Sequence, residues 1–446
     1  MDGQVDRLLG MISSENRYDI PHAEIADAQI EAANERFKSR IGMINLLGHQ
    51  AESASLSEIR ELADLVPLLF AHTTYKSYPE SWMVQQKWDR LGRWLETVSS
   101  YPVAQVDGTG IKDIDDWLAG LEEEGTFVSC SSGTTGKCSM IAATMADRQF
   151  AKDNTALAFS WGTGVDPSSK FKVMATVPVP SSPRNKDVRA AISETFGDGD
   201  DYTFPDANMT IGQVSRMVAL RRGIGDGTAL PEELTEFERI SEGRQAEIDA
   251  GMQRTVEALI ENRGKKLLIS GQFQLLFQMV ELIRAQGYGR ESFNPENAMF
   301  IGGGLKGAVL PEGYLDLILD TFNTPFEKLY QYYGMQEINT TMPRCKAKRY
   351  HIPPWLLPLV LDEHGEALVE PSGGEVEGRA GFFDLSLDGR WGGVISGDKV
   401  NVRFDRCDCG QGGPTVGYDI VRYADLGDGD KITCAGTIDA YIRGVS

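Results

Sequence analysis

Residues 126–140 combine a short strand pattern with a loop that is rich in glycine and hydroxyl side chains. Thr126–Ser129 alternates as a buried strand does, and the sequence CSSGTTGKCSM follows it directly. Gly133 and Gly136 let the backbone turn sharply and approach a ligand closely. Lys137 adds a positive charge at the exit of the loop, where backbone N–H groups also favour an anion. The segment therefore predicts a strand followed by a loop that binds a polyphosphate.

This loop is not of the Walker type. A Walker loop requires Gly-x4-Gly-Lys-Ser/Thr, and counting back from Lys137 places Ser131 and Cys138 where glycine and Ser/Thr belong. The hydroxyl groups that can donate to phosphate oxygens lie inside the loop, on Ser131, Ser132, Thr134 and Thr135. An ordinary Ser/Thr/Gly surface turn is the alternative interpretation.

Composition narrows the functional class. The chain has 446 residues, of which 41% are hydrophobic and 24% charged, as expected for a globular protein with two or three domains or with one large α/β domain and additions. The net charge of −21 argues against a nucleic-acid surface, which requires a basic face. We find no apolar signal region in residues 1–9 and no apolar run of membrane-spanning length. The sequence therefore predicts a soluble, cytoplasmic protein without a nucleic-acid or membrane partner.

The hydrophobic pattern changes twice along the chain and predicts three parts. Residues 1–120 are mainly helical in pattern, residues 121–344 form an α/β nucleotide-binding core, and residues 345–446 are β-rich. Strand patterns in the core are expected at Lys172–Val179, Lys266–Ser270 and Asn297–Ile301. Helical patterns are expected at Met140–Ala151, Glu242–Asn262, Phe273–Gln286 and Tyr314–Phe322. The predicted fold class is therefore α/β, with mostly parallel sheets flanked by helices and a β-rich C-terminal subdomain.

The glycine- and hydroxyl-rich loop resembles the phosphate loop of the adenylate-forming (acyl-activating) superfamily. The form Ser-Ser-Gly-Thr-Thr-Gly-Lys is most similar to phenylacetate–CoA ligases and to the acyl-protein synthetases of bacterial luminescence systems. The resemblance implies a large layered adenylation domain and an enzyme that uses ATP and Mg²⁺. It further implies that the phosphates are bound by Lys137 and by Ser131, Ser132, Gly133, Thr134, Thr135 and Gly136.

A second motif lies about 200 residues further along the chain, at Tyr332–Glu337. It resembles the Tyr-Gly-x-Thr-Glu block of the same superfamily, with Gln336 in place of the usual Thr or Ser. The resemblance implies that Tyr333, followed by Gly334, stacks on adenine and that Glu337 holds Mg²⁺. The chemistry agrees, because an aromatic face suits a purine and a carboxylate oxygen suits Mg²⁺.

Two shorter motifs match the superfamily in order. The glycine turn Gly302–Gly307 is similar to one that lines the nucleotide and acyl pockets, so Gly303 and Gly304 are expected there and Lys306 is a candidate substrate-contacting cation. A plain strand-to-helix turn is the alternative. Gly397-Asp398 resembles a Thr-Gly-Asp motif whose aspartate accepts from both ribose hydroxyls. Asp425 competes with Asp398 for that role.

Four residues in the last quarter of the chain have the chemistry of a metal site. Cys345, His351, Cys407 and Cys409 offer three thiolates and one imidazole, which satisfy a closed tetrahedral Zn²⁺ site. Phenylacetate–CoA-ligase-like proteins show a similar order of Cys, His and Cys-x-Cys-Gly. Such a site stabilises a fold and does not catalyse. Reduced cysteines that simply pack in the core are the alternative.

The resemblance implies a reaction in which ATP activates a small carboxylic acid as an acyl-adenylate and releases pyrophosphate. Gly436–Asp439 resembles the hinge before the mobile C-terminal lid of relatives, and seven residues follow it, so the lid and its lysine are expected to be absent. Lys137 or Lys306 then supplies that charge. Without a lid, a thiol or amine acceptor, including a carrier or partner protein, is favoured. An acyl-CoA ligase and a non-catalytic nucleotide-binding relative are the alternatives, and Cys434 is a candidate internal acyl acceptor.

Overall fold

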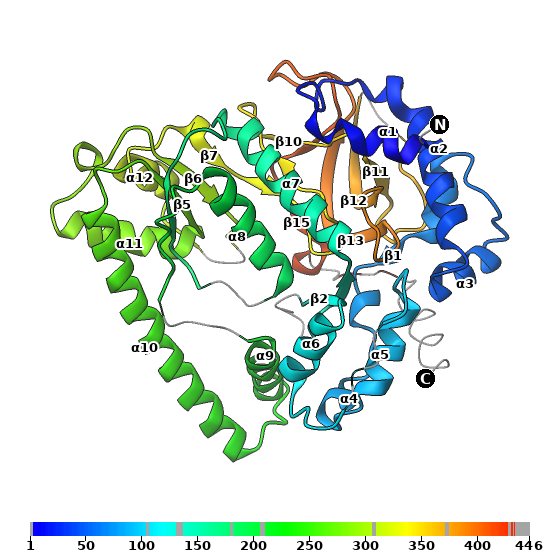
Figure 1. The fold of residues 1–446 in the computed structure, drawn as a ribbon, viewed down its shortest axis with the longest axis horizontal. Coiled ribbons are helices and arrows are strands. Elements are labelled where there is room, and N and C mark those ends of the chain that lie inside the picture. The colour runs from blue at the N-terminus through cyan, green and yellow to red at the C-terminus, as the bar shows by residue number, and fades with distance from the viewer. Residues whose placement is uncertain are drawn as a thin grey trace. The chain divides into compact units, whose positions relative to one another are not determined.

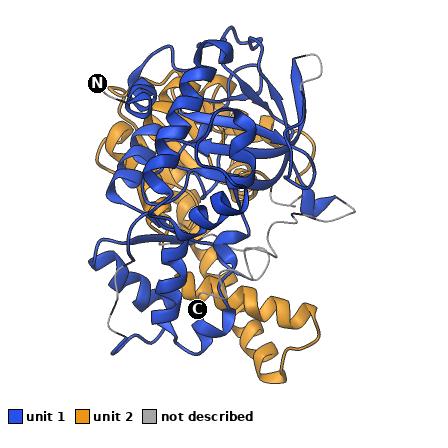
Figure 2. Cartoon of the chain, turned by 90° about the vertical axis from the view of Figure 1, so that its right-hand side faces the viewer, with its two compact units in different colours: residues 1–131, 137–154, 334–446 blue, residues 132–136, 155–333 orange. Residues whose placement is uncertain are grey.

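A computed structural model describes most of the chain. The residues it describes are 3–103, 106, 108–130, 137–178, 182–205, 210–305, 309–370, 374–426, 430 and 432. They form two compact units, coloured separately in Figure 2. The first unit contains the described residues of 1–131, 137–154 and 334–446, and the second contains those of 155–333. The three parts expected from the sequence are defined by hydrophobic pattern, whereas these two units are defined by compactness. The three-part division therefore stays a prediction.

The N-terminal part of the first unit is mainly helical. Its α-helices are α1 (Gln4–Gly10), α2 (His22–Arg40), α3 (Asn45–Ser53), α4 (Glu80–Val84), α5 (Trp88–Thr97) and α6 (Ile114–Glu123). Its 3-10 helices are η1 (Met11–Ser13), η2 (Leu62–Leu68) and η3 (Thr74–Lys76). Gln86 lies between α4 and α5 and has a φ of 52°, which is outside the right-handed helical region. This residue therefore separates the two helices. Asp113 begins α6 by accepting from the backbone N–H groups of Asp115 and Asp116.

A seven-stranded sheet forms the rest of the first unit's core (Figure 1). Its strands are β1 (Phe70–Ala71), β10 (Arg349–His351), β11 (Leu356–Leu361), β12 (Glu375–Asp384), β13 (Gly393–Arg403), β14 (Thr415–Gly417) and β15 (Val421–Arg422). The order is β10-β14-β13-β12-β11, and β1 and β15 also pair with β13. Among the described residues after Cys345 we find no α-helix, only the 3-10 helix η6 (Tyr423–Asp425). The β-rich C-terminal region is therefore confirmed.

One predicted helix begins later than its sequence pattern suggests. Met140–Ala143 forms strand β3, which pairs antiparallel with β2 (Phe127–Cys130), and helix α7 (Met145–Thr163) begins only after it. Four apolar residues fit a buried strand as well as a helix turn. Pairing with an equally buried strand decides between them, and it overrides the helix propensity of the two alanines. The predicted phosphate loop thus connects two paired strands.

The second unit is built on a parallel sheet, as predicted. Its strands β4 (Lys172–Ala175), β5 (Leu267–Gly271), β6 (Ala298–Ile301) and β7 (Leu329–Tyr330) lie in that order and are all parallel. Its helices are α8 (Pro183–Phe196), α9 (Ile211–Gly225), α10 (Pro231–Glu261), α11 (Phe273–Ala285) and α12 (Tyr314–Thr321), with 3-10 helices η4 (Arg290–Ser292) and η5 (Phe326–Lys328). Strand β8 (Tyr332–Tyr333) follows β7, and β9 (Met342–Pro343) belongs to the first unit.

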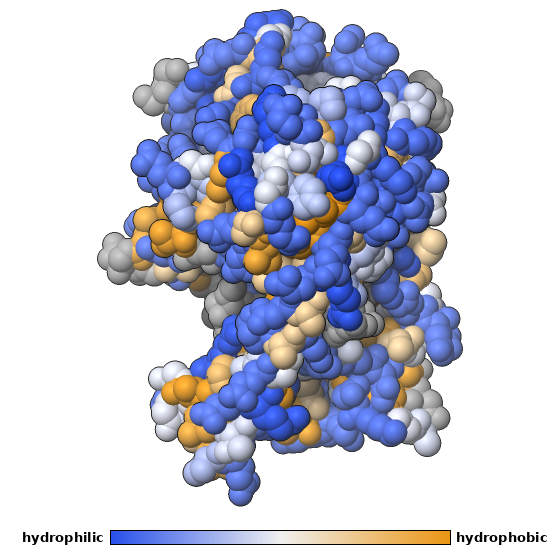
Figure 3. Space-filling view, turned by 90° about the vertical axis from the view of Figure 1, so that its left-hand side faces the viewer, coloured by the Kyte–Doolittle hydropathy of each residue, from blue (hydrophilic) through white to orange (hydrophobic). Residues whose placement is uncertain are grey.

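Both faces of the parallel sheet are covered. Alternate residues of one strand enter different cores: Met299 packs with α10, α11 and α12, whereas Phe300 packs with Phe159 of α7 and Phe196 of α8. A parallel sheet buried on both faces is the hallmark of α/β folds. Hydrophilic residues predominate on the face drawn in Figure 3. Every helix in the described part of the chain is too short or too polar to cross a membrane.

Candidate functional site

The predicted phosphate loop lies largely outside the described residues. This applies to Ser131, Ser132, Gly133, Thr134, Thr135 and Gly136, and also to Lys306 and Cys434. Both flanks of the loop are described. Cys130 ends β2 and pairs with Met140 of β3, and both cysteines next to the loop, Cys130 and Cys138, are buried. A β-hairpin therefore fixes the two ends of the loop.

Lys137 is held at the exit of the loop. Its Nζ donates to the backbone carbonyls of Tyr78 (2.6 Å) and Lys76 (3.2 Å), and it lies 5.2 Å from the centre of the Tyr78 ring. The hydroxyl of Tyr78 in turn donates to the carbonyl of Cys138 at 2.8 Å. These contacts tie residues 76–78 to the loop exit. A contact between Lys137 and phosphates stays a prediction.

Glu337 lies among charged groups of the first unit. Burial raises the pKa of its carboxyl group, while the nearby charges of Lys76 and Arg390 oppose that rise and Asp398 adds to it. Arg390 also donates to the backbone carbonyl of Glu337 at 3.2 Å. A carboxylate that faces two cations and another carboxylate has the surroundings of an ionic site. Sequence reasoning identified Glu337 and Asp398 but missed Lys76 and Arg390, which belong to no recognised motif.

Asp147, near the start of α7, is a buried hydrogen-bond acceptor. Its Oδ1 accepts from the backbone N–H of Asp388 (2.8 Å) and from Nδ2 of Asn339 (2.9 Å). Its Oδ2 accepts from the backbone N–H groups of Gly389 (2.8 Å) and Thr144 (2.9 Å). Burial alone raises the pKa of Asp147, but the charge of Arg390 and these hydrogen bonds outweigh it, so the pKa is lowered. The carboxylate joins three chain segments.

The residues that follow Glu337 are fixed by two more buried acceptors. Asp384 Oδ2 accepts from the backbone N–H groups of Asn339 and Thr340, both at 3.0 Å. Asn154 Oδ1 accepts from the backbone N–H of Thr341 at 2.8 Å. Residues 339–341 thus donate five hydrogen bonds to side chains, including that of Asn339 to Asp147 and that of the Thr341 hydroxyl to Asn154. Glu337 lies two residues before this segment.

Asp398 lies on β13 beside a second cluster of charges. Strand β15 pairs Arg422 with Asp398, so the competing Asp425 follows from the same corner of the sheet. The imidazole of His72 lies so close to Gly397 that a Cβ there would sit 3.3 Å from its Cε1. Asp430 lies 3.7 Å from His72 Nε2 and 2.9 Å from the fully buried guanidinium of Arg379. The space beside Gly397 is narrow, which explains why a glycine precedes Asp398.

In the second unit, two predicted motifs meet at one sheet edge. Gly302–Gly304 follows β6 and Tyr332–Tyr333 follows β7, and these strands are parallel neighbours. Gly303 has a φ of 74°, which favours glycine. A Cβ on Gly302 would lie 3.9 Å from the hydroxyl of Tyr332, and Tyr333 is 8% exposed. The carboxyl edge of a parallel sheet is where α/β folds bind ligands.

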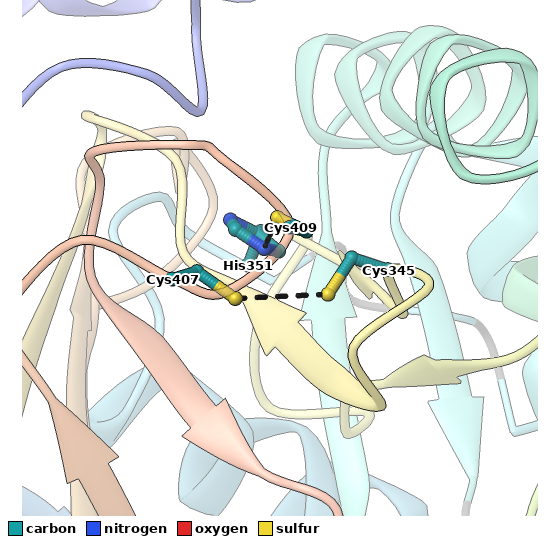
Figure 4. Close-up of side chains that lie close together, drawn as sticks. All are labelled: Cys345, His351, Cys407 and Cys409. Carbon is teal, nitrogen blue, oxygen red and sulfur yellow. Dashed lines mark hydrogen bonds between the residues drawn. The ribbon is translucent and has the colours of Figure 1, made fainter.

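The four predicted metal ligands converge in the first unit (Figure 4). Their ligand atoms all lie within 4.8 Å of one another. The sulfur atoms of Cys345 and Cys407 are 3.8 Å apart, and Cys409 Sγ is 3.3 Å from His351 Nε2. Around one tetrahedral Zn²⁺ with Zn–S bonds of ~2.3 Å, two sulfur ligands lie about 3.8 Å apart. The chain thus forms a Cys/His cluster with the dimensions of a metal site.

Two tight turns present these ligands. Gly410 has a φ of 102° and donates to the carbonyl of Cys407 at 2.8 Å, which folds the Cys-x-Cys-Gly sequence back on itself. Lys348, with a φ of 56°, donates to the carbonyl of Cys345 at 3.0 Å. Hydrogen bonds from the thiol of Cys345 and from His351 lower the pKa of Cys407. The pKa of Cys345 is raised by its hydrogen bond to Cys407 and that of Cys409 by burial. The cluster therefore favours one thiolate, at Cys407, and the thiolate is the form that binds metals.

Comparison with known proteins identifies the fold. No protein-family model and no curated protein matches this chain. Among solved structures it is similar to 2-hydroxyisobutyryl-CoA ligase in an open conformation with 2-HIB-AMP and CoA, with a TM-score of 0.55 at 14% identity, over 92% of this chain and 77% of that one. The same ligase in its thioesterification state matches with a TM-score of 0.52 at 15% identity, over 92% and 70%. At these identities the likeness establishes the fold alone.

The chain therefore has the fold of 2-hydroxyisobutyryl-CoA ligase. This confirms the predicted fold class, and membership of the adenylate-forming superfamily stays a prediction. The phenylacetate–CoA-ligase-like branch and the roles of individual site residues stay predictions.

Proposed function

We propose that this chain is an ATP- and Mg²⁺-dependent enzyme that activates a small carboxylic acid as an acyl-adenylate and releases pyrophosphate. The observation that carries the proposal is the Ser-Ser-Gly-Thr-Thr-Gly-Lys loop at a β-hairpin, in a fold whose solved example holds 2-HIB-AMP. An oxygen of the acid attacks the α-phosphorus of ATP, and pyrophosphate leaves. Bound Mg²⁺ would neutralise negative charge on the phosphates.

Each proposed role follows from the chemistry of the side chain. Tyr333 offers an aromatic face to adenine, and Asp398 offers two acceptor oxygens to the ribose hydroxyls. Glu337 offers its carboxylate as a metal ligand. The nearby cations Lys76 and Arg390 offset the negative charge of this carboxylate. The phosphate loop binds the phosphates through backbone N–H and hydroxyl donors. Lys137 closes the loop exit, and Lys306 is proposed to contact the acid.

A thiol is the proposed acyl acceptor. The solved ligase of the same fold holds CoA as well as its adenylate. CoA and a carrier-bound pantetheine thiol share this chemistry, and an amine is the alternative. Hydroxylamine trapping of the adenylate, followed by competition with CoA or an amine, distinguishes these acceptors.

The first prediction concerns Glu337. Glu337→Gln is expected to lower the rate of ATP–pyrophosphate exchange with a cognate acid by about 10²-fold, because one charged ligand to the metal–phosphate group is lost. The exposed Glu327→Gln is the matched control and should retain the parent rate. Lys137→Ala and Lys306→Ala should each lose about 10²-fold as well. A parent protein that exchanges no pyrophosphate with any fatty or aromatic acid, yet binds ATP, is the non-catalytic relative instead.

The second prediction separates the two candidate ribose ligands. Asp398→Ala is expected to raise the KM for ATP about tenfold or more, since a charge-assisted hydrogen bond contributes ~1.5–3 kcal/mol. It should also remove the preference for ATP over 2′-deoxy-ATP. Asp425→Ala is the matched variant and should keep that preference. The reverse result would assign the role to Asp425.

A second proposal concerns the Cys/His cluster. We propose that Cys345, His351, Cys407 and Cys409 bind one structural Zn²⁺. Three sulfur atoms and one nitrogen within 4.8 Å of one another fit this ion in ligand type and in dimensions. All four ligand positions of a tetrahedron are filled by protein, so the site offers no open position for catalysis. Its contribution is to the stability of the first unit.

A further inference from the structure

Arg390 is a buried cation that belongs to no recognised motif. It is 3% exposed, and its guanidinium donates three hydrogen bonds to backbone carbonyls. Nη1 donates to Ala142 at 2.9 Å, and Nη2 donates to Gln336 at 3.3 Å and to Glu337 at 3.2 Å. Burying a charge is costly unless it is well paired. A charged side chain that is buried in this way is expected to have a role that a neutral side chain cannot fill.

The three acceptors belong to two different parts of the proposed site. Ala142 lies on β3, the strand that leads out of the phosphate loop. The other two carbonyls belong to the segment that carries Glu337. A guanidinium is planar and presents its donors in a fixed fork, so it holds two segments at a set separation. An ammonium group is a single point and cannot bridge them in the same way.

Arg390 is itself held in place from the other side. The two residues before it, Asp388 and Gly389, donate their backbone N–H groups to the carboxylate of Asp147. A Cβ on Gly389 would lie 2.8 Å from Asp147 Oδ2, so the close approach of this turn requires glycine. Asp147 follows β3 by only a few residues and lies in the first turn of α7. The turn before Arg390 is therefore attached to the chain just after β3. Ala142, one of the three acceptors of Arg390, lies on β3 itself.

We infer that Arg390 is a positioning residue that sets the place of Glu337 relative to the strand leaving the phosphate loop. The inference rests on the proposed function in so far as Glu337 is a metal ligand. Arg390 is not a catalytic residue, because its hydrogen bonds end on backbone atoms. Its effect on a reaction must therefore pass through the geometry of Glu337 and of the loop.

The first test uses Arg390→Lys, with Arg36→Lys as the matched control. Arg36 is also a partly buried arginine of the first unit, and it donates twice to one carbonyl, that of Leu385. In ATP–pyrophosphate exchange, Arg390→Lys is expected to raise the half-saturating Mg²⁺ concentration about tenfold while leaving the KM for the acid unchanged. A parallel rise of both constants, or the same effect in Arg36→Lys, would indicate a general structural defect and overturn the inference.

The second test does not depend on activity. Amide hydrogen exchange of the protein, free of magnesium and nucleotide, is followed in residues 334–342, 140–144 and 356–361. Arg390→Lys should accelerate exchange at least tenfold in the first two segments and leave the third, strand β11, at the parent rate. Arg390→Gln, which keeps a planar amide donor, is measured alongside in case the lysine variant fails to fold. Unchanged exchange in residues 334–342 of the folded variant overturns the inference.

The two tests also separate this inference from the proposed function. If the parent exchanges pyrophosphate with no acid while Arg390→Lys still loosens residues 334–342, the proposed function is wrong and the positioning role of Arg390 stands. If the parent is active and its Mg²⁺ dependence is untouched by Arg390→Lys, the proposed function stands and the inference is wrong.

Discussion

Replacing Asp147 by asparagine is expected to lower the free energy of unfolding by about 3–5 kcal/mol, the usual cost of breaking a buried charged network. The side chain is 1% exposed and accepts from five groups on three chain segments. Asparagine has nearly the same shape but turns one acceptor into an NH₂ donor. If that donor occupies the Oδ2 position, it faces the backbone N–H groups of Thr144 and Gly389. Both are then buried without an acceptor.

The size of this effect depends on pH in a defined direction. The pKa of Asp147 is lower in the folded chain than its ordinary value of 3.8, so folding favours the ionised form. Such a group stabilises the fold above its unfolded pKa and loses that contribution as the pH falls through the folded pKa. Asparagine does not titrate. The difference between parent and variant is therefore expected to be full at pH 7 and to shrink below about pH 4.

The measurement is urea unfolding of parent and variant at pH 7 and at several lower values. Asp153→Asn is the matched control, because Asp153 is an exposed aspartate of the same helix that accepts from Gln149. It should change the free energy of unfolding by less than about 0.5 kcal/mol. A loss of stability for Asp147→Asn that is equally small, or that stays constant down to pH 3, contradicts the assigned role of the carboxylate.

The features that sequence predicts well here are those that local chemistry specifies. Three cysteines and one histidine have few roles together, and the chain brings their ligand atoms within 4.8 Å of one another. Strands and helices alternate in residues 172–322, and this order likewise predicts a parallel sheet. Helices cover both faces of such a sheet, so its strands are apolar on both faces.

The features that sequence fails to predict depend on partners far away in the chain. Asp147 is one acidic residue near a helix start, which occurs in many helices without further meaning. Its partners Asn339 and Asp388 lie 192 and 241 residues away, and no local pattern announces that they meet. Met140–Ala143 fails for the same reason, because its strand form depends on pairing with β2. Lys76 and Arg390 become visible only once the fold places them near Glu337.

Removal of the proposed zinc ion is expected to destabilise the first unit. An ion present at a thousandfold above its Kd stabilises the folded chain by about 4 kcal/mol. That contribution disappears when a chelator binds the ion or when a ligand is lost. Without the ion, three cysteine sulfur atoms and one imidazole remain crowded within 4.8 Å, and each thiolate formed there repels the next. Loss of the ion should therefore loosen the turns at Lys348 and Gly410 first, and then the edge strand β10 and its neighbour β14, which follow these turns.

The measurement combines metal analysis with thermal unfolding. Protein purified without chelator should contain about one Zn²⁺ per chain, and a strong chelator should lower its Tm. Cys407→Ser should lower the Tm to that of the chelated parent and be insensitive to chelator. Cys138→Ser is the matched control, because Cys138 is also buried but lies outside the cluster, so this variant should keep its zinc and its response to chelator. Nucleotide binding should survive in Cys407→Ser below its Tm, since a closed four-ligand site contacts no substrate. Absence of zinc from the parent, together with a Tm that no chelator changes, would leave the four residues as reduced side chains that only pack together.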